Sequence, residues 1–265
     1  MAVLLMVIGG ISPASAQTAR PQHARLSLIP EQTALVSGSQ WIGLRFQLDP
    51  GWHIYWTNPG DSGEPPKITW HLPAGITASD LHFPTPHRIQ DHGLTDYGYE
   101  GEVVLLSKLT TAAGSASNRA EIGADVRYLI CREVCVPARD HVSLTFPADN
   151  GSAASAAIRN AESQLPQALP FRTHIRVVAQ PDSFVLTVAK PSGIGRITDF
   201  MAADPQTIEN AAKPVLQESA KVSRMQLKKS DQLKQEISKL RGLLIAGEKA
   251  YDVSLPLVKA KASHK

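Results

Sequence analysis

Cys131 and Cys135 are the residues of this chain whose type and spacing point most directly to chemistry. They are the only two cysteines among 265 residues, and three residues separate them in the stretch YLICREVCVPA. In an oxidising compartment, two nearby thiols can close into a disulfide. A disulfide needs Cα atoms about 4.4–6.8 Å apart, and facing positions of a tight hairpin meet that requirement. We therefore expect a disulfide across a hairpin turn.

The bond between these cysteines could be a structural staple or a working redox couple. Closing a loop of about five residues stabilises a fold by roughly 2 kcal/mol, which is little for a lone staple. Three arginines flank the pair, Arg127, Arg132 and Arg139, and Glu133 partly offsets them. Positive charge lowers a cysteine pKa and favours the reactive thiolate. From the residues alone, the two interpretations remain evenly balanced.

Two predicted strands position the cysteines. Apolar residues alternate with more polar ones from Ile122 to Ile130, and again from Val142 to Phe146. This period of two is typical of half-buried strands, so the cysteine pair lies where one strand ends and the next begins. In this phase the even positions face the core. Cys131 falls on the opposite face, so we expect its sulfur to be accessible.

The N-terminus indicates export. Residues 1–16, MAVLLMVIGGISPASA, combine an apolar run with small residues before a cleavage point near Ala16, as in a signal peptide. We therefore expect a periplasmic protein. No later apolar run approaches the roughly 20 residues of a membrane helix, so we expect no transmembrane domain of its own. A net charge of +3, scattered along the chain, argues against nucleic acid as a partner.

The rest of the chain predicts an all-β fold in two domains. Its 19 prolines and 18 glycines are spread between short alternating segments, as in a protein of strands and turns. We place the domains at 17–150 and 151–258, with a short helix at Ala153–Leu165 and a tail at 259–265. Gln217–Leu240 suits a surface helix, although part of it, Val222–Lys229, could equally be a strand. Arg241–Leu257 is expected to form a hairpin with Gly247 in its turn.

Three segments together resemble a known family. In order, they are GWHIYWTNPGDSGEPP, FPTPHRIQDHGLTDYGYEGEVVL and YLICREVCVPA. Their order and spacing are similar to the periplasmic N-terminal region of the thiol:disulfide interchange family (protein-disulfide reductase, DsbD-type). The likeness is to its copper-sensitivity suppressor-like branch in particular. It extends over roughly Leu26–Leu257.

This resemblance implies a fold, an activity and partners. The implied fold is two immunoglobulin-like β-sandwich domains, and the implied catalytic pair is Cys131 and Cys135, cycling between dithiol and disulfide without a cofactor. In the family, electrons come from a membrane-embedded electron-transfer protein and pass to periplasmic thioredoxin-like proteins. Copper tolerance and cytochrome c biogenesis are the associated processes. Because this chain stops at Lys265, before any membrane region, we expect its electron donor to be a separate protein.

The resemblance also implies residues that shield the sulfurs and a preferred point of attack. Cys135 is the cysteine expected to meet partner proteins. The shielding positions fall in a cap loop and on a neighbouring strand: Asp91, His92 and Tyr97 in the loop, His53 and Tyr55 on the strand.

Two other function classes remain open. Thiolates are suitable ligands for Cu(I), and His87 or His92 could join the two cysteines, although two cysteines at this spacing are a weak metal signal. We therefore expect no metal among the site residues. A plain interaction module with a structural disulfide is the other alternative. The remaining histidines are assigned to ordinary hydrogen bonding: His71, His82, His141 and His174.

Overall fold

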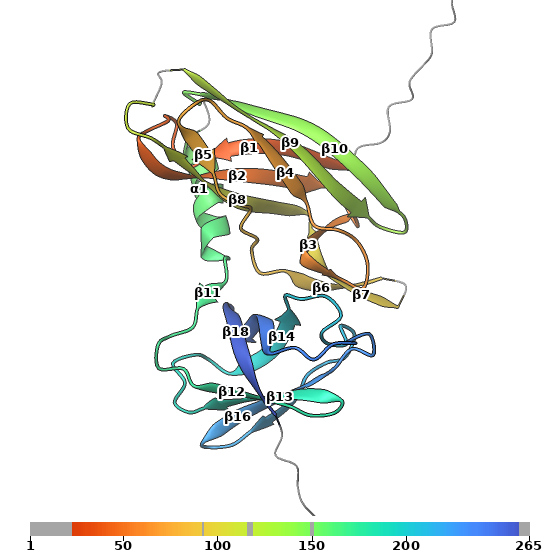
Figure 1. The fold of residues 1–265 in the computed structure, drawn as a ribbon. Coiled ribbons are helices and arrows are strands. Elements are labelled where there is room, and N and C mark those ends of the chain that lie inside the picture. The colour runs from red at the N-terminus through yellow and green to blue at the C-terminus, as the bar shows by residue number, and fades with distance from the viewer. Residues whose placement is uncertain (1–22, 92, 116–118, 149–150, 260–265) are drawn as a thin grey trace, which may run out of the picture.

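In the described part of the chain, the regular secondary structure is almost entirely β-strand, with a single α-helix, which confirms the all-β prediction (Figure 1). The predicted signal peptide, its cleavage point, His92 and the tail beyond residue 259 lie outside the described ranges. Within those ranges, no helix has the length and apolarity that a membrane crossing needs. The computed structural model describes residues 23–91, 93–115, 119–148 and 151–259.

Residues 24–146 form the first β unit, in which two sheets face each other. One sheet has the order β1-β2-β8-β5, and the other has the order β10-β9-β3-β7-β6 with β4 also paired to β9. The strands are β1 (Ala24–Pro30), β2 (Gly38–Leu48), β3 (His53–Gly60), β4 (Lys67–His71), β5 (Ile76–Ala78), β6 (His87–Asp91), β7 (Leu94–Glu100), β8 (Glu102–Thr111), β9 (Ala120–Cys131) and β10 (Cys135–Phe146).

The core of the first unit follows from the alternation in its strands. Ile42, Leu44 and Phe46 of β2 point inward and are at most 1% exposed, while Ile122 and Val126 of β9 meet them from the other sheet. Each such side chain, when fully buried, stabilises the fold by roughly 1.5–3 kcal/mol. The even-numbered face of β9 is therefore held against the core, as the sequence predicts.

The helix α1 (Gly151–Ser163) packs on the outside of the first unit. Its buried Ala154 and Ile158 are four residues apart, on one helical face, and lie against Ile29 of β1 and Leu106 of β8. Gly43 leaves the room for this contact, since a Cβ there would lie 2.8 Å from Ile158 Cδ1. The helix predicted at the start of the second domain thus covers a sheet of the first unit.

Residues 167–259 form the second β unit, a single sheet with the order β14-β17-β18-β12-β13-β16-β15 and β11 paired to β18. The sheet encloses its own apolar cluster, which includes Val177, Leu186, Phe200 and Leu244. The strands are β11 (Gln167–Ala168), β12 (Ile175–Ala179), β13 (Ser183–Ala189), β14 (Ile197–Ala202), β15 (Val215–Glu218), β16 (Val222–Lys228), β17 (Lys239–Ala246) and β18 (Lys249–Lys259).

The structure decides the segment Gln217–Leu240, for which the sequence allowed a surface helix or, in part, a strand. The helix is wrong and the strand at Val222–Lys229 is confirmed, because Met225 and Leu227 alternate inward from β16 while Arg224 and Lys228 point to solvent. The predicted hairpin near the C-terminus is confirmed by the β17–β18 pairing. Gly247 in its turn has a φ of 62°, a conformation that favours glycine.

Candidate functional site

The two cysteines form a disulfide at the tip of the β9–β10 hairpin. Cys131 ends β9, Cys135 begins β10, and the two are register partners with Cα atoms 4.1 Å apart. Cys135 is exposed, and Val134 beside it in the turn is 64% exposed. The predicted hairpin disulfide is confirmed, and one of its sulfurs belongs to an exposed residue.

Cys131 differs from the sequence expectation, because it is only 2% exposed. The alternation predicted the correct face of β9 for Cys131, which points away from the core between the two sheets. The outer face of the sheet, however, is covered by other residues at this position. His53 of β3 is its register partner and is itself 3% exposed. Register partners in an antiparallel pair place their side chains together on one face. The cysteine is therefore covered by a neighbour from a distant part of the chain.

Tyr55 connects the exposed sulfur to buried polar groups. Its side chain is fully buried, and its hydroxyl lies 3.7 Å from Cys135 Sγ. The same hydroxyl is 3.2 Å from His53 Nε2 and 3.5 Å from Ser62 Oγ. Tyr55 and His53 are two residues apart on β3 and so share the face that holds Cys131. The structure thus brings both predicted ring-bearing residues to the disulfide.

Asp96 lies at the inner end of this polar chain. The Ser62 backbone N–H and hydroxyl donate to its two carboxylate oxygens, each at 2.8 Å, and His53 Nε2 is 3.9 Å away. Burial raises the pKa of Asp96, while the bonds from Ser62 and the charge of His53 act in the opposite direction. A continuous polar path therefore runs from Cys135 through Tyr55 and Ser62 to a carboxylate. Sequence reasoning missed both Ser62 and Asp96.

The segment Gly60–Gly63, which begins at the last residue of β3, shields Tyr55. Gly63 lies against the tyrosine ring with a φ of 85°, and a Cβ there would come within 2.2 Å of Tyr55 Cζ. No side chain fits at this position without displacing the ring. Gly60 is equally close to β7, where a Cβ would lie 2.5 Å from the Thr95 carbonyl oxygen. The turn glycines of the GDSG stretch were a visible signal of this close approach.

The residues predicted for the cap loop are placed differently. Asp91 ends β6, and His92 lies outside the described residues. Tyr97 is fully buried on the core side of β7, edge-on to Trp56, and burial raises its pKa to about 12. Because neighbouring strand residues point to opposite faces, Asp96 rather than Tyr97 reaches the disulfide side.

The second β unit is bonded to the shielding segment. Asp61 accepts hydrogen bonds from the Thr95 backbone N–H and from Asn210 Nδ2, both at 2.8 Å. Asn210 belongs to the second unit, in the connection between β14 and β15. Figure 1 shows the β6–β7 end of the first unit facing β14. The loop over Tyr55 is therefore held by both units.

Arg88 of β6 donates hydrogen bonds to three residues of the second unit. Its guanidinium donates to both carboxylate oxygens of Asp199, at 2.9 and 3.0 Å, and to the carbonyls of Phe200 and Asn210. Burial lowers the pKa of Arg88, but its bonds and charge interactions with Asp199 and Tyr97 outweigh that effect and leave it raised. The arginine stays charged and fastens β6 to the second unit.

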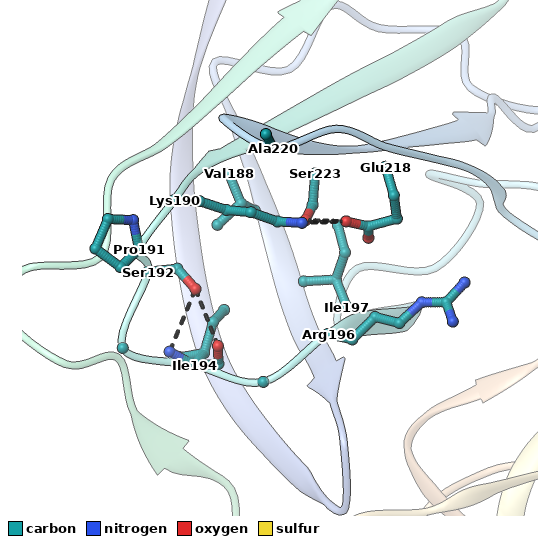
Figure 2. A pocket seen from close by; sticks show the side chains of 12 residues that line it. Val188, Lys190, Pro191, Ser192, Ile194, Arg196, Ile197, Glu218, Ala220 and Ser223 are labelled. Carbon is teal, nitrogen blue, oxygen red and sulfur yellow. Dashed lines mark hydrogen bonds and ion pairs between the residues drawn. The ribbon is translucent and has the colours of Figure 1, made fainter.

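A pocket of about 830 Å³ lies in the second unit, away from the disulfide (Figure 2). Lys190 and Glu218 face each other in it, with Nζ and Oε2 2.5 Å apart, and Ser223 donates to the same carboxylate at 2.8 Å. Lys190 and Glu218 thus satisfy each other within the pocket.

His87, considered above as a Cu(I) ligand, is instead paired to Glu100 at 3.3 Å.

Together, the fold and the site define a β-sandwich protein with a disulfide at a hairpin tip, one cysteine exposed and the other buried against a polar chain. Residues 25–147 match the model of the N-terminal domain of thiol:disulfide interchange protein DsbD. The family resemblance of the three sequence segments is confirmed.

Solved structures extend the likeness in fold to most of the chain. The N-terminal periplasmic domain of ScsB from Proteus mirabilis superposes with a TM-score of 0.67 at 18% identity, covering 89% of this chain and 92% of that one. A titin immunoglobulin tandem (TM-score 0.20, 10% identity, covering 90% and 99%) and the periplasmic chaperone SfaE (0.23, 9%, 89% and 100%) are too distant in shape to inform the argument. Among curated proteins, none matches the chain significantly.

Proposed function

We propose that this protein performs thiol–disulfide interchange in the periplasm, using Cys131 and Cys135 as a dithiol–disulfide couple. It receives electrons from a membrane-embedded partner and passes them to periplasmic thioredoxin-like proteins, as a member of the copper-sensitivity suppressor-like branch. The observation that carries the proposal is the exposed Cys135 at the hairpin tip, with the Tyr55 hydroxyl 3.7 Å from its sulfur. The match of residues 25–147 to the DsbD N-terminal model and the signal-like N-terminus support the compartment and the partners.

The chemistry divides into two exchanges, each through a mixed disulfide. A thiolate of the donor attacks Cys135 Sγ, the bond to Cys131 breaks, and Cys131 leaves as a thiolate that takes up a proton. A second donor thiolate then attacks the donor sulfur of the mixed disulfide and releases Cys135. The donor is thereby oxidised to a disulfide, and this protein is reduced by two electrons.

The second exchange passes those electrons on. The Cys135 thiolate attacks the disulfide of the acceptor and forms a mixed disulfide with it. The Cys131 thiolate then attacks Cys135 Sγ, which restores the disulfide seen in the structure, and the acceptor leaves as a dithiol after taking up protons. The exposed Val134 gives the partner an apolar surface next to the attacked sulfur.

The reduction potential tests whether the disulfide is a working couple. The full chain is equilibrated in dithiothreitol or glutathione redox buffers, and the fraction of free thiol is measured by alkylation. We expect a potential above about −300 mV, the upper bound for inert structural disulfides. A potential well below about −300 mV would identify the bond as a structural disulfide. The protein would then be an interaction module without a redox role.

Trapping mixed disulfides in cells tests which of the two cysteines reacts with partner proteins. Cys131→Ser leaves the exposed thiol without its resolving partner, so mixed disulfides with thioredoxin-like proteins should accumulate. Cys135→Ser leaves only the buried Cys131 and should trap far less. Equal trapping by both variants would contradict the assignment of Cys135 as the attacked sulfur.

A further inference from the structure

His71, Asp125 and His141 lie together on the outer face of the second sheet of the first unit. They come from three adjacent strands, β4, β9 and β10, and all three side chains are at least 52% exposed. His141 is the register partner of Asp125, and His71 pairs with Gly123, two residues along the same face. The sheet thus assembles residues that are up to 70 positions apart in sequence.

The atoms of this cluster that could bind a metal ion lie close to one another. His71 Nε2 and His141 Nδ1 each lie 2.7 Å from a different carboxylate oxygen of Asp125. One ligand atom from each residue falls within 4.8 Å of the other two. Ligand atoms around an ion bound at 2.0–2.2 Å are about 3 Å apart, so this spacing needs only small side-chain adjustments.

Gly123 lies beside both histidines. A Cβ added there would be in ordinary van der Waals contact with them, 3.5 Å from His71 Cβ and 3.6 Å from His141 Cε1. A side chain larger than alanine at this position would crowd both histidines. The β9 and β10 strands that carry two of the three ligands are each 12 residues long and paired along their whole length, which holds the ligands at a fixed spacing.

We propose that His71, Asp125 and His141 form a binding site for a divalent transition-metal ion. Two imidazole nitrogens are borderline donors that suit Zn²⁺, Ni²⁺ and Cu²⁺, and the carboxylate adds a negatively charged oxygen ligand; affinity at such a site is highest for Cu²⁺. With three protein ligands and exposed surroundings, the ion keeps open coordination positions. This site is additional to the disulfide and uses neither sulfur.

The local charges set the strength of the site. Arg127, two residues along the same face, and its register partners Lys67 and Arg139 repel a cation. Asp125 and Cys131 are six residues apart on β9, about 20 Å along an extended strand, so a bound ion does not touch the disulfide.

Metal titration of the oxidised, untagged full chain tests the proposal. We expect one equivalent of Cu²⁺ to bind with nitrogen hyperfine structure in its paramagnetic resonance spectrum. His71→Ala and His141→Ala should each weaken the binding at least tenfold. Gly123→Val should weaken it while leaving all three ligands in place.

The matched control is His87→Ala, which removes an exposed histidine that is also paired to a carboxylate but, among the described residues, belongs to no cluster of three potential metal ligands. This variant should bind Cu²⁺ as the unaltered protein does. The proposal is overturned if His71→Ala and His141→Ala bind normally, or if His87→Ala abolishes binding. Circular dichroism of each variant verifies that the fold is retained, so that lost binding is not lost folding.

Discussion

At the scale of single residues, the exchange chemistry depends on what surrounds Cys135. The buried Tyr55 hydroxyl is placed to donate a hydrogen bond to the Cys135 thiolate once the disulfide opens. A hydrogen bond to a charged group contributes about 1.5–3 kcal/mol. Since one pKa unit corresponds to about 1.4 kcal/mol, this bond should lower the thiol pKa by about one to two units.

Tyr55→Phe should therefore raise the pKa of Cys135 in the reduced protein by about one to two units and slow its alkylation at neutral pH. The pH dependence of the alkylation rate measures this change. Tyr99→Phe is the matched control, because its buried hydroxyl bonds to the Pro84 carbonyl instead. An unchanged profile in Tyr55→Phe would show that the hydroxyl does not stabilise the thiolate.

At the scale of elements, the shielding segment depends on strands from both β units. The Gly60–Gly63 connection is held by β7 on one side and by Asn210 on the other. The neighbouring β6 is fastened to β14 by Arg88 and Asp199, whose side chains are 20% and 25% exposed. An ion pair this far from solvent loses more when one partner is removed than a surface pair does.

Arg88→Met should reduce the free energy of unfolding by about 1–3 kcal/mol, because Asp199 loses its partner in a half-buried place. Urea unfolding of the full chain measures the loss. Arg241→Met is the matched control, since that arginine makes a similar paired contact with Asp204 but is 58% exposed. This substitution should cost less stability than Arg88→Met, because solvent screens an exposed ion pair. Equal losses in the two variants would contradict a supporting role for the contact between the units.

At the scale of the whole molecule, the buried Asp96 makes stability depend on pH. Its pKa is raised in the folded protein, so the folded state binds an extra proton between the ordinary value near 3.9 and the raised value. Its contribution is fully present below the ordinary value and is lost as the pH rises through the raised value. His53, Ser62 and Asp61 are the groups that face it.

Asp96→Asn should remove this contribution, so its stability relative to the unaltered protein should improve as the pH rises from about 4 to 7. Chemical unfolding at a series of pH values measures the difference. The exposed Asp80→Asn serves as the control for a lost surface carboxylate. Parallel stability curves for Asp96→Asn and the unaltered protein would contradict the raised pKa.

Local patterns in the sequence were sufficient to predict the two strands around the cysteines and the disulfide between them. Alternation predicted the two strands around the cysteines, and the spacing of Cys131 and Cys135 predicted their pairing across a turn. Both features depend on residues that are close in the chain, as does the β17–β18 hairpin around Gly247. The segment Gln217–Leu240 stayed open between a helix and a strand, because its surface charges hide the inward alternation of Met225 and Leu227.

Only the tertiary structure decided which residues surround the sulfurs. The alternation placed Cys131 on the outer face, yet His53 from a distant strand covers it. Ser62 and Asp96 meet at the site, and His71 meets His141 across the sheet, through strand pairings that no short pattern encodes. A strand's period of two determines which side a residue faces. What lies on that side depends on long-range pairing, and this pairing determines the burial, the hydrogen bonds and the chemistry of the site.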